Sequence, residues 1–564
     1  MNNRSNRTLT AMFQNSVETY ANRPALGMID GQILSYAEFG KQVEDMSEFL
    51  RKEGIDNGDR VAILSENCVN WVIAFFAVTT MGAVAVPILP EFHANEVQHI
   101  LRHSQSKAIF ISEKLYNKLE EMDLVDLKLI ILIDNFSIVP KRTSEARLTE
   151  MMREGSKELA KLRVAAKRLT GLHSASIDEN DLVSIIYTSG TTGHSKGVML
   201  THKNIISDAE MTLQIVPVNH EDRLLSILPL SHTYENTLGL IIPVRQGASI
   251  YYLDKPPTAR VLLPAMQKIK PTMMLTVPLV IEKIYKMRIL PQFTSKALMR
   301  KLYKNSLIRK QLHRIAGKKL IHSFGGEIRF FGVGGAALSP EVEMFLREAN
   351  FPYAIGYGLT ETSPLIAGTG PALTRFRSTG PAIPGVQLQI RDQHPITGEG
   401  EIVVKGDNVM QGYFNDPERT REILSEDGWL RTGDLGRLDK DNYLYIKGRL
   451  KNMILGPSGE NIYPEGIESI INESDWVLES LVYEQHGQLI ARVHLNYEKI
   501  DEEFRKRNTS NTQIAKEIET ILANLRNEVN SRVSSFSRLQ RIIEQPEPFE
   551  KTPTQKIKRY LYTQ

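Results

Sequence analysis

A loop rich in glycine and hydroxyl groups, placed directly after an apolar run, constrains this chain more than any other feature. The run Leu182–Ile186 is typical of a buried strand, and it leads into the loop Tyr187–Val198. Three glycines let the loop backbone approach an anion, while main-chain N–H groups, hydroxyls and Lys196 supply donors and positive charge. The stretch therefore predicts a phosphate-binding loop at the end of a strand, and with it nucleotide chemistry.

The loop is not the Walker loop of kinases and GTPases. That motif requires Gly-Lys followed by Ser or Thr, whereas here Ser195 precedes Lys196 and Gly197 follows it. An ordinary Gly/Thr-rich surface turn is the alternative for this stretch taken alone.

The loop closely resembles the signature of the adenylate-forming superfamily, which contains acyl-CoA synthetases, firefly-type luciferases and nonribosomal-peptide adenylation domains. That family usually has Pro where this chain has Ser195, a difference that should loosen the loop without removing its donors. The resemblance extends from about Ala25 to Arg559. Five further segments resemble later motifs of the family, in the family's order: Gly356–Pro364, Arg431–Gly436, Lys447–Lys451, Gly459–Glu465 and Thr554–Arg559.

The order of apolar and amphipathic segments predicts an α/β fold with mostly parallel sheets covered by helices. The length of 564 residues exceeds what one core usually holds. We therefore expect a large N-terminal domain, residues 1–449, with a β-rich subdomain from Val386, and a small α+β C-terminal cap domain, residues 450–564. The expected strands include Arg60–Leu64, Ala108–Ile111, Leu129–Ile133, Met273–Val277 and Ile328–Phe331.

Composition favours a globular protein in a reducing compartment. Hydrophobic residues make up 41% and charged residues 24% of the chain, which excludes a mainly disordered protein. Cys68 is the only cysteine, so an intrachain disulfide is impossible. The apolar stretch Trp71–Pro87 is interrupted by polar residues and glycine, which indicates a buried helix running into a core strand. The first ten residues lack the apolar core of a signal peptide, and we expect a cytoplasmic protein.

The resemblance implies ATP, Mg²⁺ and coenzyme A as the small molecules that this protein uses. Activating a carboxylate brings two anions together, the carboxylate and the α-phosphate of ATP, so the site needs cations. The resemblance assigns Mg²⁺ to Glu361, with Thr188 near the metal. It assigns further positive charge to Lys196 in the loop and to Lys556, which the cap carries in. Carboxylate suits this metal, which prefers oxygen ligands; a surface turn carboxylate is the alternative for Glu361.

The resemblance also implies a nucleotide site. Asp434 and Arg449 would bind the ribose, small residues after a strand would lie against adenine, and Tyr357 would stack on the base. Turn chemistry and tight packing are the alternatives for these positions. The implied nucleotide-binding set is Thr188, Ser189, Gly190, Thr191, Thr192, Gly193, Lys196, Gly334, Gly335, Ala336, Gly356, Tyr357, Gly358, Thr360, Glu361, Asp434, Arg449, Lys451 and Lys556.

Members of the family rotate the cap about a hinge after the first half-reaction, and Lys451 matches that hinge. The rotation would withdraw Lys556 and present another face of the cap to a thiol. Two positions depart from the family pattern, because Asn452 stands where Asp is common and Gln555 replaces a Gly. A solvated lysine in a basic C-terminal tail is the alternative for Lys556.

The segments Leu228–Asn236 and Val277–Tyr285 resemble long-chain acyl-CoA synthetases in particular. An apolar tunnel for an alkyl chain gains about 0.8 kcal/mol for each buried methylene, so tunnel depth sets chain length. His232 either orients the carboxylate or closes the acyl site, or it is a core histidine. The expected function is a long-chain fatty acid–CoA ligase. Transfer to a carrier-protein thiol, and a silent membrane-associated lipid-binding relative, are the alternatives.

One segment is strongly basic. Residues 283–319 contain twelve Lys and Arg and neither Asp nor Glu, although the whole chain has a net charge of only +3. Apolar residues fall near helical spacing within it, namely Leu298, Leu302, Leu312 and Ile315. A basic amphipathic helix of this kind can lie on an anionic membrane, and the alternative is a solvated helix packed by its apolar stripe. Few aromatic residues and no recognised module argue against nucleic-acid binding.

Overall fold

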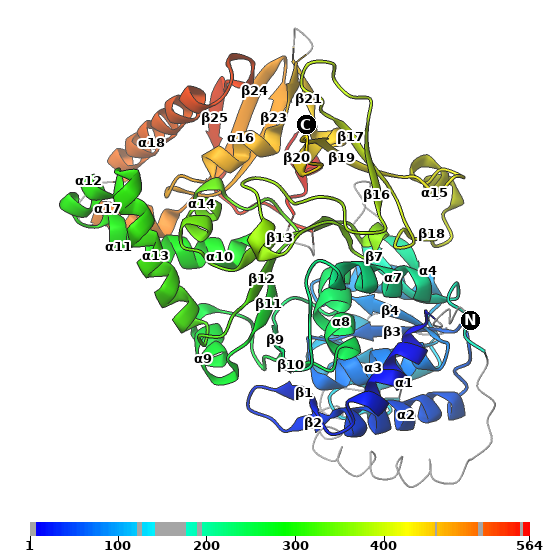
Figure 1. The fold of residues 1–564 in the computed structure, drawn as a ribbon. Coiled ribbons are helices and arrows are strands. Elements are labelled where there is room, and N and C mark those ends of the chain that lie inside the picture. The colour runs from blue at the N-terminus through cyan, green and yellow to red at the C-terminus, as the bar shows by residue number, and fades with distance from the viewer. Residues whose placement is uncertain are drawn as a thin grey trace. The chain divides into compact units, whose positions relative to one another are not determined.

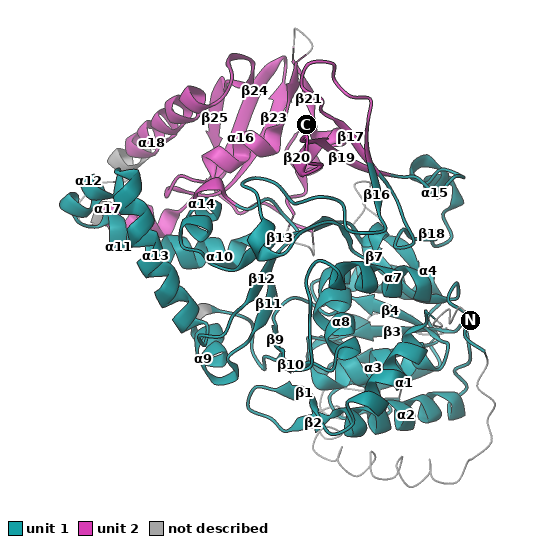
Figure 2. Ribbon diagram, in the orientation of Figure 1, with its two compact units in different colours: residues 1–338, 342–388, 404–430 teal, residues 339–341, 389–403, 431–564 magenta. Residues whose placement is uncertain are grey.

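The structure is a computed structural model that describes residues 7–120, 127–140, 176–188, 195–456, 460–505, 511–552 and 556–563. The chain forms two compact units, which Figure 2 shows in different colours. Unit 1 contains residues 1–338, 342–388 and 404–430, and unit 2 contains residues 339–341, 389–403 and 431–564. The predicted boundary at Arg449 concerns the part of the chain that is expected to rotate, and it stays a prediction.

Unit 1 contains two seven-stranded sheets, both mainly parallel and covered by helices (Figure 1). The first has the order β18-β8-β7-β4-β3-β5-β6. Strands β3 to β7 of this sheet run parallel, and β8 returns antiparallel to β7. Their bounds are β3 Arg60–Leu64, β4 Val84–Ile88, β5 Ala108–Ile111, β6 Leu129–Leu132, β7 Leu182–Thr188, β8 Lys196–Thr201 and β18 Gly412–Tyr413.

The second sheet of unit 1 has the order β13-β12-β11-β9-β10-β1-β2. It is parallel from β13 to β1, and β2 pairs antiparallel with β1. The bounds are β1 Pro24–Met28, β2 Ile33–Ser35, β9 Arg223–Ser226, β10 Ser249–Tyr252, β11 Met273–Thr276, β12 Phe330–Val333 and β13 Tyr353–Ile355.

The helices of unit 1 follow the strands, as expected for parallel sheets. Helix α3 is buried along its length because it is apolar on nearly every face, and it leads into β4 as the sequence predicts. The principal helices are α1 Leu9–Thr19, α2 Tyr36–Lys52, α3 Val69–Thr80, α4 Ala94–Ser104, α7 His202–Leu213, η2 Tyr234–Ile241, α8 Ile242–Arg245, α9 Ala259–Ile269, α10 Pro278–Ile284, α11 Leu290–Thr294, α12 Ala297–Tyr303, α13 Ser306–Ser323, α14 Pro340–Glu348 and α15 Pro417–Ile423.

Unit 2 is α+β. A four-stranded sheet has the order β16-β17-β19-β20, and a three-stranded sheet has the order β23-β24-β25. A buried core forms where α16 and α18 cover the three-stranded sheet. The bounds are β16 Gln387–Arg391, β17 Gly400–Lys405, β19 Leu430–Leu438, β20 Leu444–Arg449, α16 Pro464–Ile471, β23 Val477–Gln485, β24 Gln488–Leu495, α17 Tyr497–Arg505, α18 Asn511–Arg532 and β25 Arg541–Glu544.

The α/β prediction is confirmed. The strands expected at Leu129–Ile133 and Met273–Val277 end one residue earlier, at Leu132 and Thr276, and two further local expectations were wrong. Strand β12 begins at Phe330, not at Ile328, because its pairing with β11 starts there and the Arg329 side chain turns to Asp222, with Nε 2.8 Å from Oδ1. The basic segment forms separate helices rather than one. Asn305 interrupts it by accepting hydrogen bonds from the first backbone N–H groups of α13. In the described part of the chain, no helix is long and apolar enough to cross a membrane.

A buried polar centre joins three distant segments of unit 1. The Asn408 side-chain amide donates to the carbonyl oxygens of Thr362 at 3.0 Å and Leu365 at 2.8 Å. The same amide lies 3.3 Å from Asp208 Oδ1 on α7, which also accepts from the Leu365 N–H at 3.0 Å. Burial raises the pKa of the Asp208 carboxyl well above its ordinary range, although these hydrogen bonds oppose the shift. The centre therefore fixes the turn that carries Glu361 to α7.

We predict that Asn408→Ala lowers the free energy of unfolding by about 2–4 kcal/mol, because it leaves two buried carbonyl oxygens without donors. Denaturant unfolding of the full chain measures this loss. The exposed Asn117→Ala is the matched control and should change the value by no more than about 0.5 kcal/mol. Equal effects of the two substitutions would show that the centre does not hold unit 1 together.

Candidate active site

A charged cluster of three side chains lies at the edge of the first sheet of unit 1. Lys196 Nζ is 3.0 Å from Glu361 Oε1, and the Tyr413 hydroxyl donates to the same carboxylate oxygen at 2.8 Å. Lys196 also donates to the Tyr413 hydroxyl and lies 4.2 Å from the centre of the Tyr413 ring. The three groups thus form a closed triangle of hydrogen bonds.

Strand pairing builds this cluster from distant parts of the sequence. The hairpin β7–β8 places Thr188 opposite Lys196, on the two sides of the predicted phosphate loop. Strand β18 pairs antiparallel with β8 and sets Tyr413 opposite Val198, near Lys196. Glu361 comes from the short turn Thr360–Thr362, which follows β14 (Tyr357–Gly358).

The cluster keeps the Glu361 carboxyl ionised in a buried place. Burial alone would raise the pKa of Glu361, but the Lys196 charge and the hydrogen bonds from Tyr413 and Lys196 hold that pKa below its ordinary value. The side chain is 13% exposed. An anionic oxygen is therefore available at neutral pH, and its partner Lys196 can turn to another anion.

The residues present fit a magnesium ion shared with phosphate groups. The Thr188 hydroxyl oxygen is buried and has no hydrogen-bond partner among the described residues. Within those residues, no group of three or more His, Cys, Asp and Glu side chains is placed to hold a metal. One carboxylate and one hydroxyl match a metal that keeps waters and takes most of its ligands from a nucleotide. The predicted loop residues Ser189, Gly190, Thr191, Thr192 and Gly193 lie outside the described residues.

The predicted adenine segments follow neighbouring strands of the second sheet. Gly334 comes directly after β12 and Gly356 directly after β13, so both lie at the carboxyl edge of a parallel sheet, where ligands of such folds bind. The Gly356 N–H donates to the Val333 carbonyl at 3.1 Å and joins the two ends. Gly335 has φ +84°, which favours glycine, and Ala336 follows it. Side chains at Gly358 are excluded, because a Cβ there would lie 1.8 Å from the Pro364 carbonyl oxygen.

The predicted ribose residues pair with each other in unit 2. Asp434 on β19 lies opposite Arg449 on β20, and Arg449 Nε is 2.7 Å from Asp434 Oδ1. Asp434 is 5% exposed, and its N–H donates to the Thr432 hydroxyl. Lys451 is exposed in the turn Leu450–Asn452, which follows β20 directly.

Lys556 is exposed in unit 2, near the end of the chain. The Lys556 N–H donates to the Thr552 hydroxyl at 3.2 Å, and the Thr552 N–H donates to the Lys556 carbonyl at 2.7 Å. These two hydrogen bonds pair Lys556 with Thr552. Gln555 lies outside the described residues. The role predicted for Lys556 stays a prediction.

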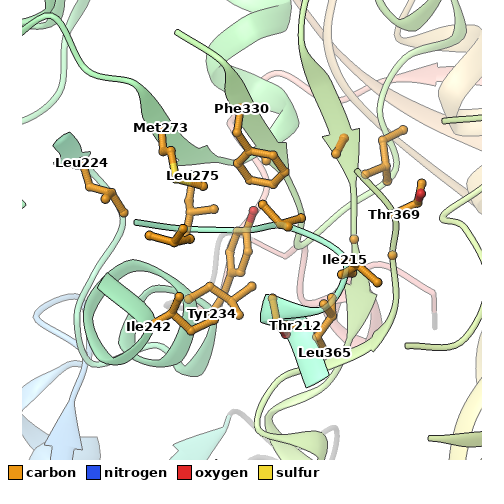
Figure 3. A pocket seen from close by; sticks show the side chains of 18 residues that line it. Thr212, Ile215, Leu224, Tyr234, Ile242, Met273, Leu275, Phe330, Leu365 and Thr369 are labelled. Atoms are coloured by element: carbon orange, nitrogen blue, oxygen red, sulfur yellow. The ribbon is translucent and has the colours of Figure 1, made fainter. Parts of the chain in front are cut away.

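An apolar pocket opens on one face of the second sheet of unit 1 (Figure 3). Because side chains alternate along a strand, Met273 and Leu275 face the pocket while Met274 faces the core on the other side. Neighbouring strands add Leu224 and Phe330 to the pocket face, in register with Met273. The pocket contains about 630 Å³ of empty space, part of it open to solvent.

Two residues define the middle of this pocket. Tyr234 reaches in from η2, a helix of the π type, and its ring stands among the strand side chains in Figure 3. Gly332 on β12 leaves room there, because a Cβ at this position would lie 2.8 Å from Leu275 Cδ2 and 3.2 Å from the Tyr234 hydroxyl. His232 lies two residues before Tyr234 and accepts a hydrogen bond from the Tyr234 N–H at 3.2 Å. The predicted residue His232 thus stands beside the base of η2, where it helps to set the path of the chain.

Sequence reasoning did not find Tyr413 or Tyr234. Tyr413 lies in the run Gly412–Asn415, in a strand of two residues that gives no periodic signal. Tyr234 lies within a segment that we noted for its resemblance, but nothing in its spacing indicates that its side chain enters a pocket.

Comparison with known proteins identifies relatives over most of the chain. Long-chain-fatty-acid–CoA ligase 1 of Cavia porcellus is 29% identical over 609 residues, covering 98% of this chain and 84% of the relative. The chloroplastic long-chain-fatty-acid–acyl-carrier-protein ligase AEE15 of Arabidopsis thaliana is 27% identical over 542 residues, covering 84% of this chain and 74% of the relative.

A solved structure shares the fold. O-succinylbenzoate coenzyme A synthetase of Bacillus subtilis, in complex with ATP and magnesium ion, matches with a TM-score of 0.72 and 22% identity, over 97% of this chain and 98% of that chain. The AMP-binding enzyme family matches residues 13–414. Since this match spans well over half of the chain, and the charged cluster lies within it, the protein belongs to the AMP-binding, adenylate-forming enzymes.

Proposed function

We propose that this protein is a long-chain fatty acid–CoA ligase. In the first step the fatty acid carboxylate attacks the α-phosphate of ATP, which forms acyl-AMP and releases pyrophosphate. In the second step the thiol of coenzyme A attacks the acyl carbonyl and releases AMP. The observation that carries the proposal is the apolar pocket, because its lining residue Gly356 also begins the segment that leads to Glu361.

The residues of the site take the following roles in this proposal. Glu361 and Thr188 would hold Mg²⁺, which neutralises phosphate charge and orients the phosphates when it is bound. Lys196 would leave Glu361 for the phosphates, and Asp434 with Arg449 would bind the ribose. Lys556 would stabilise negative charge on the α-phosphate during the first step only.

The pocket supports a substrate with an alkyl chain. Its lining is almost wholly apolar, so each methylene that enters contributes about 0.8 kcal/mol. The names of the curated relatives agree with a long-chain acid, and they include both a CoA ligase and an acyl-carrier-protein ligase. Coenzyme A is the acceptor that we propose, and a carrier-protein thiol is the alternative.

Exchange between ATP and pyrophosphate, measured with saturated acids of increasing length, tests this function. We predict exchange that rises with chain length, and thioester formation when CoA is added. Gly332→Ala should reduce exchange most for the longest acids, because the added methyl group enters the pocket where it is already close to Leu275. Gly466→Ala, at a position with no atom within 4 Å of the added group, is the matched control.

Exchange that is absent with every acid, or that is unaffected by chain length, would contradict the proposal. If a thioester forms only on a carrier protein, the acceptor is the carrier-protein thiol and not CoA. The proposed first step is then unchanged.

Glu361→Gln should reduce adenylation by about 100-fold or more and weaken the response to Mg²⁺, because a neutral amide is a poor ligand for a hard cation. Exchange rates across a magnesium series measure both effects. The exposed Glu422→Gln should behave as the unmodified protein. Normal adenylation by Glu361→Gln at low magnesium would show that Glu361 does not bind the metal.

Lys556→Ala and Lys451→Pro should affect opposite half-reactions. Lys556→Ala should lose acyl-AMP formation by orders of magnitude but still convert preformed acyl-AMP and CoA to thioester. Lys451→Pro should make acyl-AMP and fail in thioester formation, because proline restricts the rotation that the second step requires. Single-turnover rates of each half-reaction measure this pattern, and equal losses in both steps for both variants would mean that the cap does not alternate.

A further inference from the structure

Helices α12 and α13 of unit 1 expose aliphatic side chains that proteins ordinarily bury. Leu298 is 70% exposed, Leu307 is 73% exposed and Ile315 is 55% exposed. Of the four residues expected to form a packed stripe, only Leu312 packs against the core. The sequence alternative of a helix packed by its apolar stripe is therefore wrong for Leu298 and Ile315.

The exposed aliphatic residues of α13 share a face with basic residues. Leu307, Lys310, Arg314, Ile315 and Lys318 are separated by three, four, one and three positions, which places them on one side of a helix. All five are exposed, whereas the buried residues of α13 are His313, Ala316, Gly317 and Leu320. The outward face of α13 is thus both apolar and positively charged.

Most basic side chains of this surface have no acidic partner among the described residues. Residues 283–319 contain twelve basic residues and no acidic residue. Arg309 is paired, with Nη2 2.7 Å from Glu348 Oε1. Within the described part of the chain, no ion pair is formed by the exposed basic residues Arg300, Lys301, Lys304, Lys310, Arg314, Lys318 and Lys319.

A buried polar chain holds the two helices in place. The Tyr303 hydroxyl of α12 lies 2.8 Å from His313 Nε2 of α13, and His313 Nδ1 lies 2.8 Å from Glu348 Oε2 of α14. The Tyr303 ring stacks on Phe293 of α11, with 5.1 Å between the ring centres. The exposed surface is therefore a built part of the fold rather than a frayed segment.

We propose that the outward face of α12 and α13 is a docking surface for a bilayer that contains anionic lipid. Basic side chains match the charge of anionic headgroups, and aliphatic side chains enter the boundary between headgroups and acyl chains. Nucleic acid is a less suitable ligand for this face. The face exposes aliphatic side chains, whereas base stacking would need aromatic ones. This proposal is independent of the proposed reaction, because binding to lipid requires no catalysis.

Cosedimentation of the full chain with phosphatidylcholine vesicles, with and without phosphatidylserine, tests the proposal. The unmodified protein should bind only the vesicles with phosphatidylserine, and salt should weaken the binding. Each basic group near such a surface contributes about 1 kcal/mol, which changes the partition of the protein between vesicles and water about fivefold. The triple variant Arg300→Glu, Lys301→Glu, Lys310→Glu should therefore bind at least about 100-fold more weakly. A matched triple variant, Lys52→Glu, Arg421→Glu, Lys440→Glu, should keep binding.

A second pair of variants separates insertion from surface charge alone. Leu298→Ser with Leu307→Ser should weaken vesicle binding, whereas Leu373→Ser with Ile396→Ser, at equally exposed positions elsewhere, should not. All variants should unfold in denaturant at the same midpoint as the unmodified protein, which shows that they are folded.

Three results would overturn the proposal. These are absence of vesicle binding by the unmodified protein, equal binding by the first triple variant and its control, and binding of a short RNA in preference to vesicles.

Discussion

A buried carboxylate next to a lysine is the interaction on which the candidate site depends. Glu361 is nearly enclosed, and it stays ionised because Lys196 and Tyr413 stabilise its charge. The arrangement holds a negative group and a positive group side by side. In the proposed reaction Glu361 would supply an oxygen ligand to a metal and Lys196 a cation to a phosphate, and neither group would need to change its protonation state.

The fold supplies both parts of the site from one unit. Antiparallel pairing of β7, β8 and β18 gathers the cluster at one sheet, and the buried Asn408 centre ties the turn of Glu361 to α7. The alternation of side chains on β11 and β12 gives the second sheet an apolar face toward the pocket and another toward the core. Gly356 belongs to the pocket and to the segment that carries Glu361, so one stretch of backbone connects the apolar pocket with the charged cluster.

Much of this arrangement could be predicted from the sequence, for identifiable reasons. The strands Arg60–Leu64 and Ala108–Ile111 consist almost wholly of apolar residues, and their limits were predicted correctly. The start of β12 was not predicted correctly, because pairing with β11 determines where that strand begins. The sequence did not predict the role of Tyr413, because a strand of two residues shows no alternation of polar and apolar residues. The position of Tyr413 depends on the pairing of β18 with β8. Helical spacing in the basic segment indicated an apolar stripe but contained no information on which side faces solvent, and Leu298 and Ile315 face outward.

The central claim is that a fatty acid carboxylate bound in the pocket attacks the α-phosphate of ATP next to this cluster. Isotope transfer tests it most directly, with a long-chain acid whose carboxyl oxygens carry a heavy isotope, ATP, Mg²⁺ and CoA. The mass of each product is then measured. The account predicts that AMP gains one labelled oxygen for each thioester formed and that pyrophosphate gains none. Label in pyrophosphate or in inorganic phosphate, or thioester formation with unlabelled AMP, would contradict it.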